Sequence, residues 1–190
     1  MSLFGNRLLP MVPLALLLGV APSAPAVDLP RPTPEFAVQM PGGSQLLFSQ
    51  FRGKVCLIQF LYTTCPHCQH TSQMITKLYK DLAPRGFQAI GVAFNEMAGM
   101  LVPEYIKDYQ VGFPVGSSPR APVLSYLRIQ TNPEERFVVP QIVLIDKKGN
   151  IRQQSPPLGD ERLQDETYLR QQIEMLLKEP GGATSARRHP

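Results

Sequence analysis

The sequence is poor in histidine and cysteine, the side chains that hold most transition metals in proteins. It has 3 His and 3 Cys, and no histidine lies between His70 and His189. Structural zinc sites normally take four ligands, and the only nearby set, Cys65, Cys68 and His70, supplies three. We therefore expect no metal site and no other cofactor.

A concentration of charge of one sign is also lacking. The chain has 19 Lys and Arg against 15 Asp and Glu, a net charge of +4, and Arg187 and Arg188 lie near the C-terminal end. Proteins that bind nucleic acid cluster their basic residues on a stripe or a face. Nucleic acid is therefore not an expected partner.

Long apolar runs are missing as well: the apolar run near the N-terminus is short. Leu8 to Val20 follows Arg7, contains prolines and precedes Ala24-Pro25-Ala26. A transmembrane helix needs about 20 apolar residues, whereas a basic residue, a short apolar region and a small-x-small motif form a cleavable signal. We expect residues 1–26 to be a signal peptide cut after Ala26. The mature protein is then exported, into the periplasm if the source is a Gram-negative bacterium.

The rest of the chain predicts one domain with extended ends. Of the 20 prolines, eight lie in the first 41 residues, so residues 27–34 are expected to form a Pro-rich linker. Residues 35–178 are long enough for a single core. Residues 179–190, which contain Pro180-Gly181-Gly182, are expected to be a disordered tail.

Strand and helix patterns alternate in this domain. Val55 to Leu61 is almost continuously apolar, as in a strand covered on both faces, and Phe87 to Phe94 is a second such run. Between them, apolar residues recur at helical spacing from Pro66 to about Leu82. The order strand, helix, strand predicts a right-handed βαβ unit.

Shorter patterns complete the expected architecture. Pro140 cannot donate to a sheet ladder, so it should lie at the start or at an irregularity of its strand. The other expected elements are a hairpin (36–40 and 45–48), a helix (103–109), a short strand (113–115), a short helix (123–127), a strand (137–146) with its partner (151–154), and a final amphipathic helix that ends at Lys178.

The chemistry lies in Cys65-Pro66-His67-Cys68, where the first strand meets the first helix. Residues i and i+3 share a helix face, so these cysteines can form a reversible disulfide. The helix N-terminus favours thiolate over thiol at Cys65, and Cys68, one turn further, should be the buried resolving thiol. A structural disulfide is disfavoured, because so short a loop rarely staples a domain of this size.

Pro66, His67 and Cys56 have separate expected roles. Pro66 restricts the backbone between the cysteines. A cationic His67 would stabilise the thiolate, while a solvated surface histidine without influence fits the sequence equally well. Cys56 lies about 16 Å of strand away from the pair and is expected to be a buried structural residue.

Several segments besides the cysteine motif and the first apolar strand form a recognisable set. They are Phe51-Arg52-Gly53-Lys54, Gly91-Val92-Ala93-Phe94 with Asn95-Glu96, Phe113-Pro114-Val115 and Val138-Val139-Pro140-Gln141. Together these segments resemble the exported thioredoxin-like proteins of the TlpA and ResA type, which are related to the AhpC/TSA family. The resemblance covers roughly residues 35–178.

The resemblance implies an α/β thioredoxin fold. Its central mixed β-sheet is flanked by helices, with an N-terminal β-hairpin and an insertion between the βαβ and ββα halves. It further implies a cis peptide bond between Val139 and Pro140, which form the platform where the substrate chain pairs by β-augmentation. Cys65 is then the nucleophile and Cys68 the resolving thiol.

Two positions depart from the pattern of the relatives. Gln59 stands where thioredoxins carry a buried acid, and Thr71 stands where ResA-type reductases carry a glutamate. In addition, the Cys-Pro-His-Cys quartet and the valine before Pro140 resemble those of DsbA-type oxidants. The sequence therefore leaves the direction of electron flow open.

The expected function is that of an exported, monomeric thiol-disulfide oxidoreductase. Its expected partners are protein thiol or disulfide substrates and a redox partner protein, with a membrane protein as one option. One alternative is a peroxiredoxin-like peroxidase, for which Thr63 and Thr64 are present but the upstream proline is not. The other is a Sco-like copper-binding protein, which would need a distant histidine that the domain lacks.

Overall fold

The computed structural model describes residues 28–129 and 136–181. The predicted signal peptide lies outside these residues, as does the predicted tail from residue 182 onward. No helix within the described ranges is both long and apolar enough to cross a membrane.

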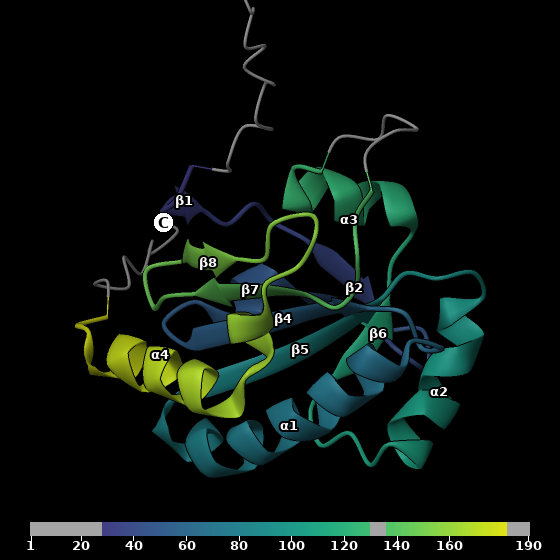
Figure 1. Ribbon diagram of the computed structural model, residues 1–190, viewed down its shortest axis with the longest axis horizontal. Coiled ribbons are helices and arrows are strands. Elements are labelled where there is room, and N and C mark those ends of the chain that lie inside the picture. The colour runs from purple at the N-terminus through teal and green to yellow at the C-terminus, as the bar shows by residue number, and fades with distance from the viewer. Residues whose placement is uncertain (1–27, 130–135, 182–190) are drawn as a thin grey trace, which may run out of the picture.

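An eight-stranded mixed sheet runs through the centre of the molecule (Figure 1), in the order β1-β8-β7-β4-β5-β6-β2-β3. The central strand β4 pairs in parallel with β5 and antiparallel with β7. The strands are β1 (Arg31–Pro32), β2 (Ala37–Gln39), β3 (Gln45–Leu47), β4 (Val55–Leu61), β5 (Phe87–Ala93), β6 (Val115–Ser117), β7 (Gln141–Ile145) and β8 (Asn150–Gln154).

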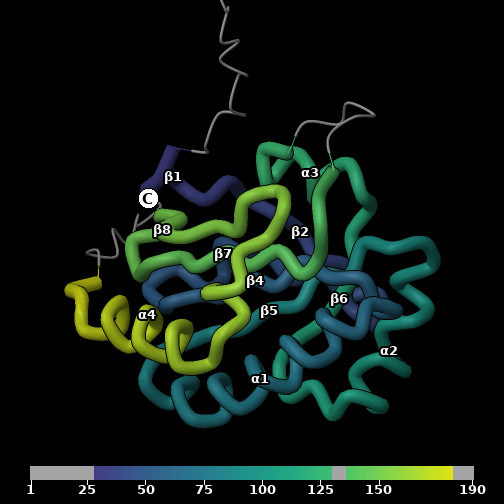
Figure 2. The backbone as a smooth tube through the Cα atoms, in the orientation of Figure 1, coloured from purple at the N-terminus to yellow at the C-terminus, as the bar shows by residue number. Residues whose placement is uncertain are grey.

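Helices cover both faces of the sheet. Residues of α1, α2 and α4 pack into one apolar cluster and residues of α3 into another, so α3 lies on the face opposite α1 (Figures 1 and 2). The α-helices are α1 (Pro66–Leu82), α2 (Ala98–Asp108), α3 (Arg120–Leu127) and α4 (Glu166–Lys178), and the 3-10 turns are η1 (Phe48–Phe51), η2 (Ala83–Arg85) and η3 (Glu161–Gln164).

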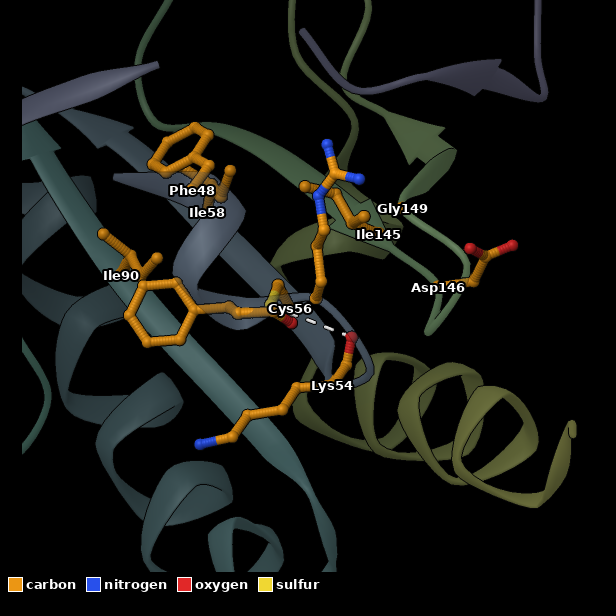
Figure 3. A pocket seen from close by; sticks show the side chains of 10 residues that line it. Phe48, Lys54, Cys56, Ile58, Ile90, Ile145, Asp146 and Gly149 are labelled. Carbon is orange, nitrogen blue, oxygen red and sulfur yellow. Dashed lines mark hydrogen bonds between the residues drawn. The ribbon is translucent and has the colours of Figure 1, made fainter. Parts of the chain in front are cut away.

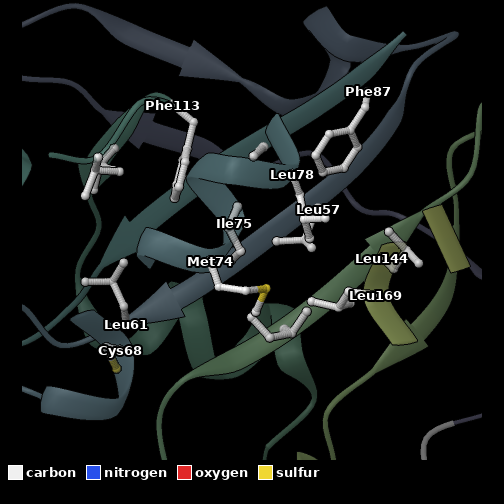
Figure 4. Packing of buried hydrophobic residues seen from close by; sticks show 14 of the residues in the cluster. Leu57, Leu61, Cys68, Met74, Ile75, Leu78, Phe87, Phe113, Leu144 and Leu169 are labelled. Carbon is white, nitrogen blue, oxygen red and sulfur yellow. The ribbon is translucent and has the colours of Figure 1, made fainter. Parts of the chain in front are cut away.

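Strand β4 divides its side chains between the two clusters, because successive residues of a strand point to opposite faces. Leu57 and Leu61 pack with α1, as Figure 4 shows, whereas Ile58 and Phe60 pack on the α3 side. All seven residues of β4 are buried. The buried strand therefore fixes the position at which the loop to the cysteine motif begins.

The structure confirms most of the predicted elements. The βαβ unit, the N-terminal hairpin and the insertion of α2, β6 and α3 between the two halves are all present. Strand β7 begins directly after Pro140, as the missing N–H of proline predicts. Helix α2 begins five residues earlier than expected, because Ala98 and Val102 add a buried first turn.

Part of the segment predicted as a Pro-rich linker, residues 27–34, joins the sheet. Arg31 and Pro32 form β1 and pair with β8. Arg31 is only 5% exposed, and its guanidinium donates to the carbonyl oxygen of Tyr126 and to Oε1 of Gln154. Buried polar groups need such partners, and the partners come from elements too distant in sequence to be seen from the proline pattern.

Candidate active site

Cys65 occupies the N-cap position of α1, with extended backbone angles. Its Sγ accepts a hydrogen bond from the backbone N–H of Cys68 at 3.4 Å. Pro66 fits the first helical position because the N–H that it lacks would have no partner there. The Cys68 N–H is one of the amides left without a partner within the helix at its N-terminus, where the positive end of the helix dipole favours negative charge.

The two cysteines of the motif differ in their surroundings. Both are free thiols; Cys65 is half-buried, whereas Cys68 is 0% exposed. Cys68 lies in the cluster beneath α1, close to Leu61 in Figure 4. Burial raises the pKa of Cys68 well above its ordinary value, so this thiol stays protonated at neutral pH.

The loop before β7 lies against Cys65. The Val139–Pro140 peptide bond is cis, as the resemblance implies. The Cys65 thiol donates to the carbonyl oxygen of Val139 at 3.7 Å, a contact between residues 74 positions apart. Val139 is half-buried and Pro140 is buried. The structure thus brings together four of the six predicted site residues: Cys65, Cys68, Val139 and Pro140.

The two residues between the cysteines are exposed in the first turn of α1. Pro66 begins the helix and limits the freedom of the motif. His67 lies in contact with solvent, a placement that fits both the tuning role and the surface histidine without influence. The role of His67 therefore stays a prediction.

Gln59, at the position of the buried acid of thioredoxins, is fully buried on the α1 side of β4. Its Nε2 donates to the carbonyl oxygen of Cys68 at 2.9 Å, and its Oε1 accepts from Ser72 Oγ at 2.8 Å. The amide at this position therefore holds the backbone of Cys68 and has no titratable proton.

Tyr105 of α2 completes this polar group. Its hydroxyl lies 2.7 Å from Ser72 Oγ and 3.2 Å from the carbonyl oxygen of Cys68. Since the proton of Ser72 goes to Gln59, the one hydroxyl proton of Tyr105 is shared between Ser72 Oγ and the Cys68 carbonyl oxygen. Burial raises the pKa of Tyr105, so the whole group is neutral over the physiological range.

Further hydrogen bonds fix the loop that precedes Cys65. The backbone N–H of Thr63 donates to Oδ1 of Asn95 at 2.9 Å, and Gln69 Nε2 donates to the Thr63 carbonyl oxygen at 3.0 Å. The Thr63 hydroxyl also pairs with Asn95, which follows β5. Of the two threonines that the peroxidase alternative invoked, Thr63 thus serves here to anchor the loop.

The sequence missed Ser72 and Tyr105. Ser72 lies one helical turn after Cys68, so helical spacing could have placed it beneath the motif. Tyr105 belongs to a different helix, and nothing in the local sequence around the cysteines points to it.

Cys56 is separate from this site. It is 5% exposed and lies on the α3 side of β4, beside a cavity of about 20 Å³ lined in part by Phe48, Ile58 and Ile90 (Figure 3). Burial raises the pKa of Cys56 to about 12. The prediction of a buried structural cysteine is confirmed.

Alkaline unfolding should report on Cys56. Its thiol ionises near pH 9 in the unfolded chain but near pH 12 in the folded one, so the native state holds one extra proton between these values and loses stability as the pH rises. In reducing buffer, the unfolding free energy of Cys56→Ala should fall less steeply with pH than that of the unaltered protein. The difference in slope should reach up to about 1.4 kcal/mol per pH unit between these two pKa values. Urea titrations from pH 8 to 11 measure the unfolding free energy of both proteins. If the two plots of free energy against pH run parallel, the raised pKa of Cys56 is contradicted.

Comparisons with known proteins agree with this geometry. The ResA thiol-disulfide oxidoreductases of Bacillus thuringiensis subsp. konkukian and Bacillus cereus are each 23% identical to the chain over 128 residues, 67% of this chain and 69% of the relative. Among solved structures, a thiol:disulfide interchange protein of the thioredoxin family from Chlorobium tepidum TLS has a TM-score of 0.63 at 23% identity, covering 80% of this chain and 99% of that one.

A second solved structure, a thiol:disulfide interchange protein from Bacteroides sp., has a TM-score of 0.63 at 18% identity and covers 84% of this chain and 95% of that one. These likenesses confirm the thioredoxin fold. With the paired thiols, the relatives identify the reaction class as thiol-disulfide exchange. Residues 30–154, more than half of the sequence, match the AhpC/TSA family, and the chain belongs to that family.

Proposed function

We propose that this thiol-disulfide oxidoreductase acts on protein thiol or disulfide substrates, with Cys65 as the nucleophile and Cys68 as the resolving thiol. One observation carries the proposal. The sulfur of Cys65 lies at the N-terminus of α1, 3.4 Å from the N–H of Cys68 and 3.7 Å from the carbonyl oxygen of Val139. One sulfur atom thus contacts the backbone of the second cysteine, at the start of α1, and the platform loop.

The reaction balances in two steps. The Cys65 thiolate attacks a substrate disulfide; one Cys65–substrate S–S bond forms, the substrate S–S bond breaks, and the other substrate sulfur leaves as a thiolate. Cys68 then attacks Cys65, which forms the Cys65–Cys68 disulfide and releases the second substrate thiol. The substrate gains two electrons, and the same steps in reverse oxidise a dithiol.

The second step requires a proton to leave Cys68. Gln59 cannot accept it, and Tyr105 is itself a neutral hydrogen-bond donor with a raised pKa. We therefore assign the proton to the departing substrate thiolate, the strongest base formed in this step. No buried protein acid takes part in this scheme.

Val139 and Pro140 provide the substrate platform in this proposal. In the dithiol state the Val139 carbonyl oxygen accepts the Cys65 thiol proton. When Cys65 enters a mixed disulfide, that carbonyl becomes available to a backbone N–H of the substrate strand, as in β-augmentation. The Val139 carbonyl oxygen thus becomes free in the step in which the substrate is covalently attached.

A trapping experiment tests these roles. Cys68→Ser should halt the reaction after the first step and accumulate a mixed disulfide between Cys65 and a model peptide that contains a disulfide. Mass spectrometry of the intact adduct and of its peptides measures it. The control Cys65→Ser should form no adduct; an adduct through Cys56, or none from Cys68→Ser, contradicts the assignment.

We also propose that the protein is exported and works as a monomer, its cysteine pair restored by a redox partner protein. The basic, apolar and small-x-small pattern of residues 1–26 supports export. Expression of the full chain in a Gram-negative host should yield periplasmic protein whose N-terminal residue is Val27. Uncut protein retained in the cytoplasm would contradict export while leaving the cysteine chemistry untouched.

A further inference from the structure

Arg120, the first residue of α3, links two segments of the active site from outside it. Its Nη1 donates to the hydroxyl of Tyr62, and its guanidinium carbon lies 4.6 Å from the centroid of the Phe137 ring. Tyr62 directly follows β4, and Phe137 precedes Val139 by two residues. One side chain therefore contacts both the cysteine loop and the platform loop.

The two contacted rings are also joined beneath the guanidinium. Phe94, which follows β5, lies 4.7 Å from the Tyr62 ring and 6.2 Å from the Phe137 ring, nearly parallel to the latter. Aromatic pairs at these separations attract one another. Tyr62, Phe94 and Phe137 form an aromatic bridge, and Arg120 of α3 contacts Tyr62 and Phe137 on the α3 face of the sheet.

Tyr62 is directly connected to the nucleophile. Its carbonyl oxygen accepts the backbone N–H of Cys65 at 3.1 Å. A change in the position of Tyr62 would therefore move the start of α1 and the sulfur of Cys65. A change in the position of Phe137 would similarly move Val139, since only Val138 lies between them.

The active site contains a second link between these loops, but it does not survive the reaction. The Cys65 thiol donates to the Val139 carbonyl oxygen, and that contact is lost once Cys65 forms a disulfide with the substrate. The Arg120 contacts involve neither the reacting sulfur nor that carbonyl. They can persist while the substrate is covalently attached.

We propose that Arg120 is a positioning residue that holds the cysteine loop and the platform loop at the separation a substrate chain requires. The inference rests on the proposed function. A guanidinium suits this position because its planar fork donates hydrogen bonds and stacks on an aromatic ring at the same time. A substrate that pairs with Val139 should depend on this spacing, whereas a small disulfide that meets only Cys65 should not.

The test compares two substrates of different size. With the dithiol form of the protein as the only electron donor and a disulfide-containing peptide of about ten residues, we expect Arg120→Ala to lower kcat/KM of single-turnover disulfide reduction at least fivefold, mainly through a higher KM. With the small aromatic disulfide 5,5′-dithiobis(2-nitrobenzoate), the rate should change less than twofold. Arg120→Lys, which keeps a cation above Phe137, should recover part of the peptide activity.

Two further variants separate positioning from general damage. Tyr62→Phe removes the hydroxyl that Arg120 contacts but keeps the ring, so it should lower peptide activity without changing the far-ultraviolet circular dichroism spectrum. Lys54→Ala is the matched control. It removes a cation 5.9 Å from the centroid of the Phe51 ring, at the opposite end of β4, and both activities should be unchanged.

Three results would overturn the inference: equal losses on the peptide and the small disulfide, no loss with Arg120→Ala, or a loss of the same size with Lys54→Ala. If the unaltered protein reduces neither disulfide, the proposed function fails and this inference fails with it. That outcome is distinguishable because it appears without any substitution.

Discussion

Cys65→Ser is expected to reduce disulfide-exchange activity by more than about a hundredfold, since a serine hydroxyl remains un-ionised and cannot replace the thiolate nucleophile. The structure accounts for the size of this effect. Cys68 is fully buried with a raised pKa, and Cys56 lies on the other face of the sheet. Neither can substitute for Cys65. Reduction of the peptide disulfide, followed by its released thiols, measures the loss.

The matched control for this substitution is Cys56→Ser, which removes the third thiol and should keep exchange activity within about twofold of the unaltered protein. Circular dichroism spectra of both variants should show the native helix and strand content. Activity that survives Cys65→Ser, or disappears with Cys56→Ser in a folded protein, would contradict the assignment of the nucleophile.

Phe60→Ala is expected to produce the largest loss of stability, about 3–5 kcal/mol of unfolding free energy. Phe60 is 0% exposed, and its ring lies 5.9 Å from that of Phe36 and 5.4 Å from that of Tyr126. It therefore joins the central strand to the residue preceding the N-terminal hairpin and to α3. The chain has no tryptophan, so urea unfolding is best followed by far-ultraviolet circular dichroism.

Phe60→Leu provides the comparison, because it keeps most of the buried volume and should cost less than about 1.5 kcal/mol. A loss below about 1 kcal/mol for Phe60→Ala would show that the aromatic cluster is not packed as the structure describes. Since α3 also carries Arg120, the alanine variant should in addition weaken peptide reduction more than reduction of the small disulfide.

Local sequence patterns predicted the core of the fold. The apolar run of β4, the helical spacing of α1 and the position of Pro140 each reflect forces that act within a few residues: burial of a central strand, an amphipathic face and a missing backbone donor. The i, i+3 spacing of Cys65 and Cys68 is of the same kind.

Other parts of the site depend on contacts between distant segments. The contact of Cys65 with Val139 was implied by the resemblance and not by spacing, as the two residues are 74 positions apart. Tyr105 contacts the Cys68 carbonyl oxygen from α2, and Arg120 of α3 contacts the cysteine loop from outside the site. Strand β1 forms because Arg31 finds buried partners near β8. Tertiary packing decides such features, and no periodicity in the chain encodes them.

The structure gives Gln59 a role that the sequence did not indicate. The sequence indicated only that an acid is missing. The structure shows a neutral amide that bonds the Cys68 carbonyl oxygen and Ser72. Gln59 therefore supports the helix that carries Cys68, and we expect no pH dependence of exchange from a titrating group at residue 59.

The central claim is that Cys65 and Cys68 form one reversible two-electron couple, and equilibration with glutathione tests it most directly. The purified protein is incubated with defined ratios of reduced and oxidised glutathione, quenched in acid, alkylated and mapped by mass spectrometry. We predict one transition between a dithiol and a Cys65–Cys68 disulfide, with Cys56 reduced throughout; its midpoint gives the reduction potential and hence the favoured direction of exchange. A disulfide that includes Cys56, or a pair that stays in one state at every ratio, would contradict the account.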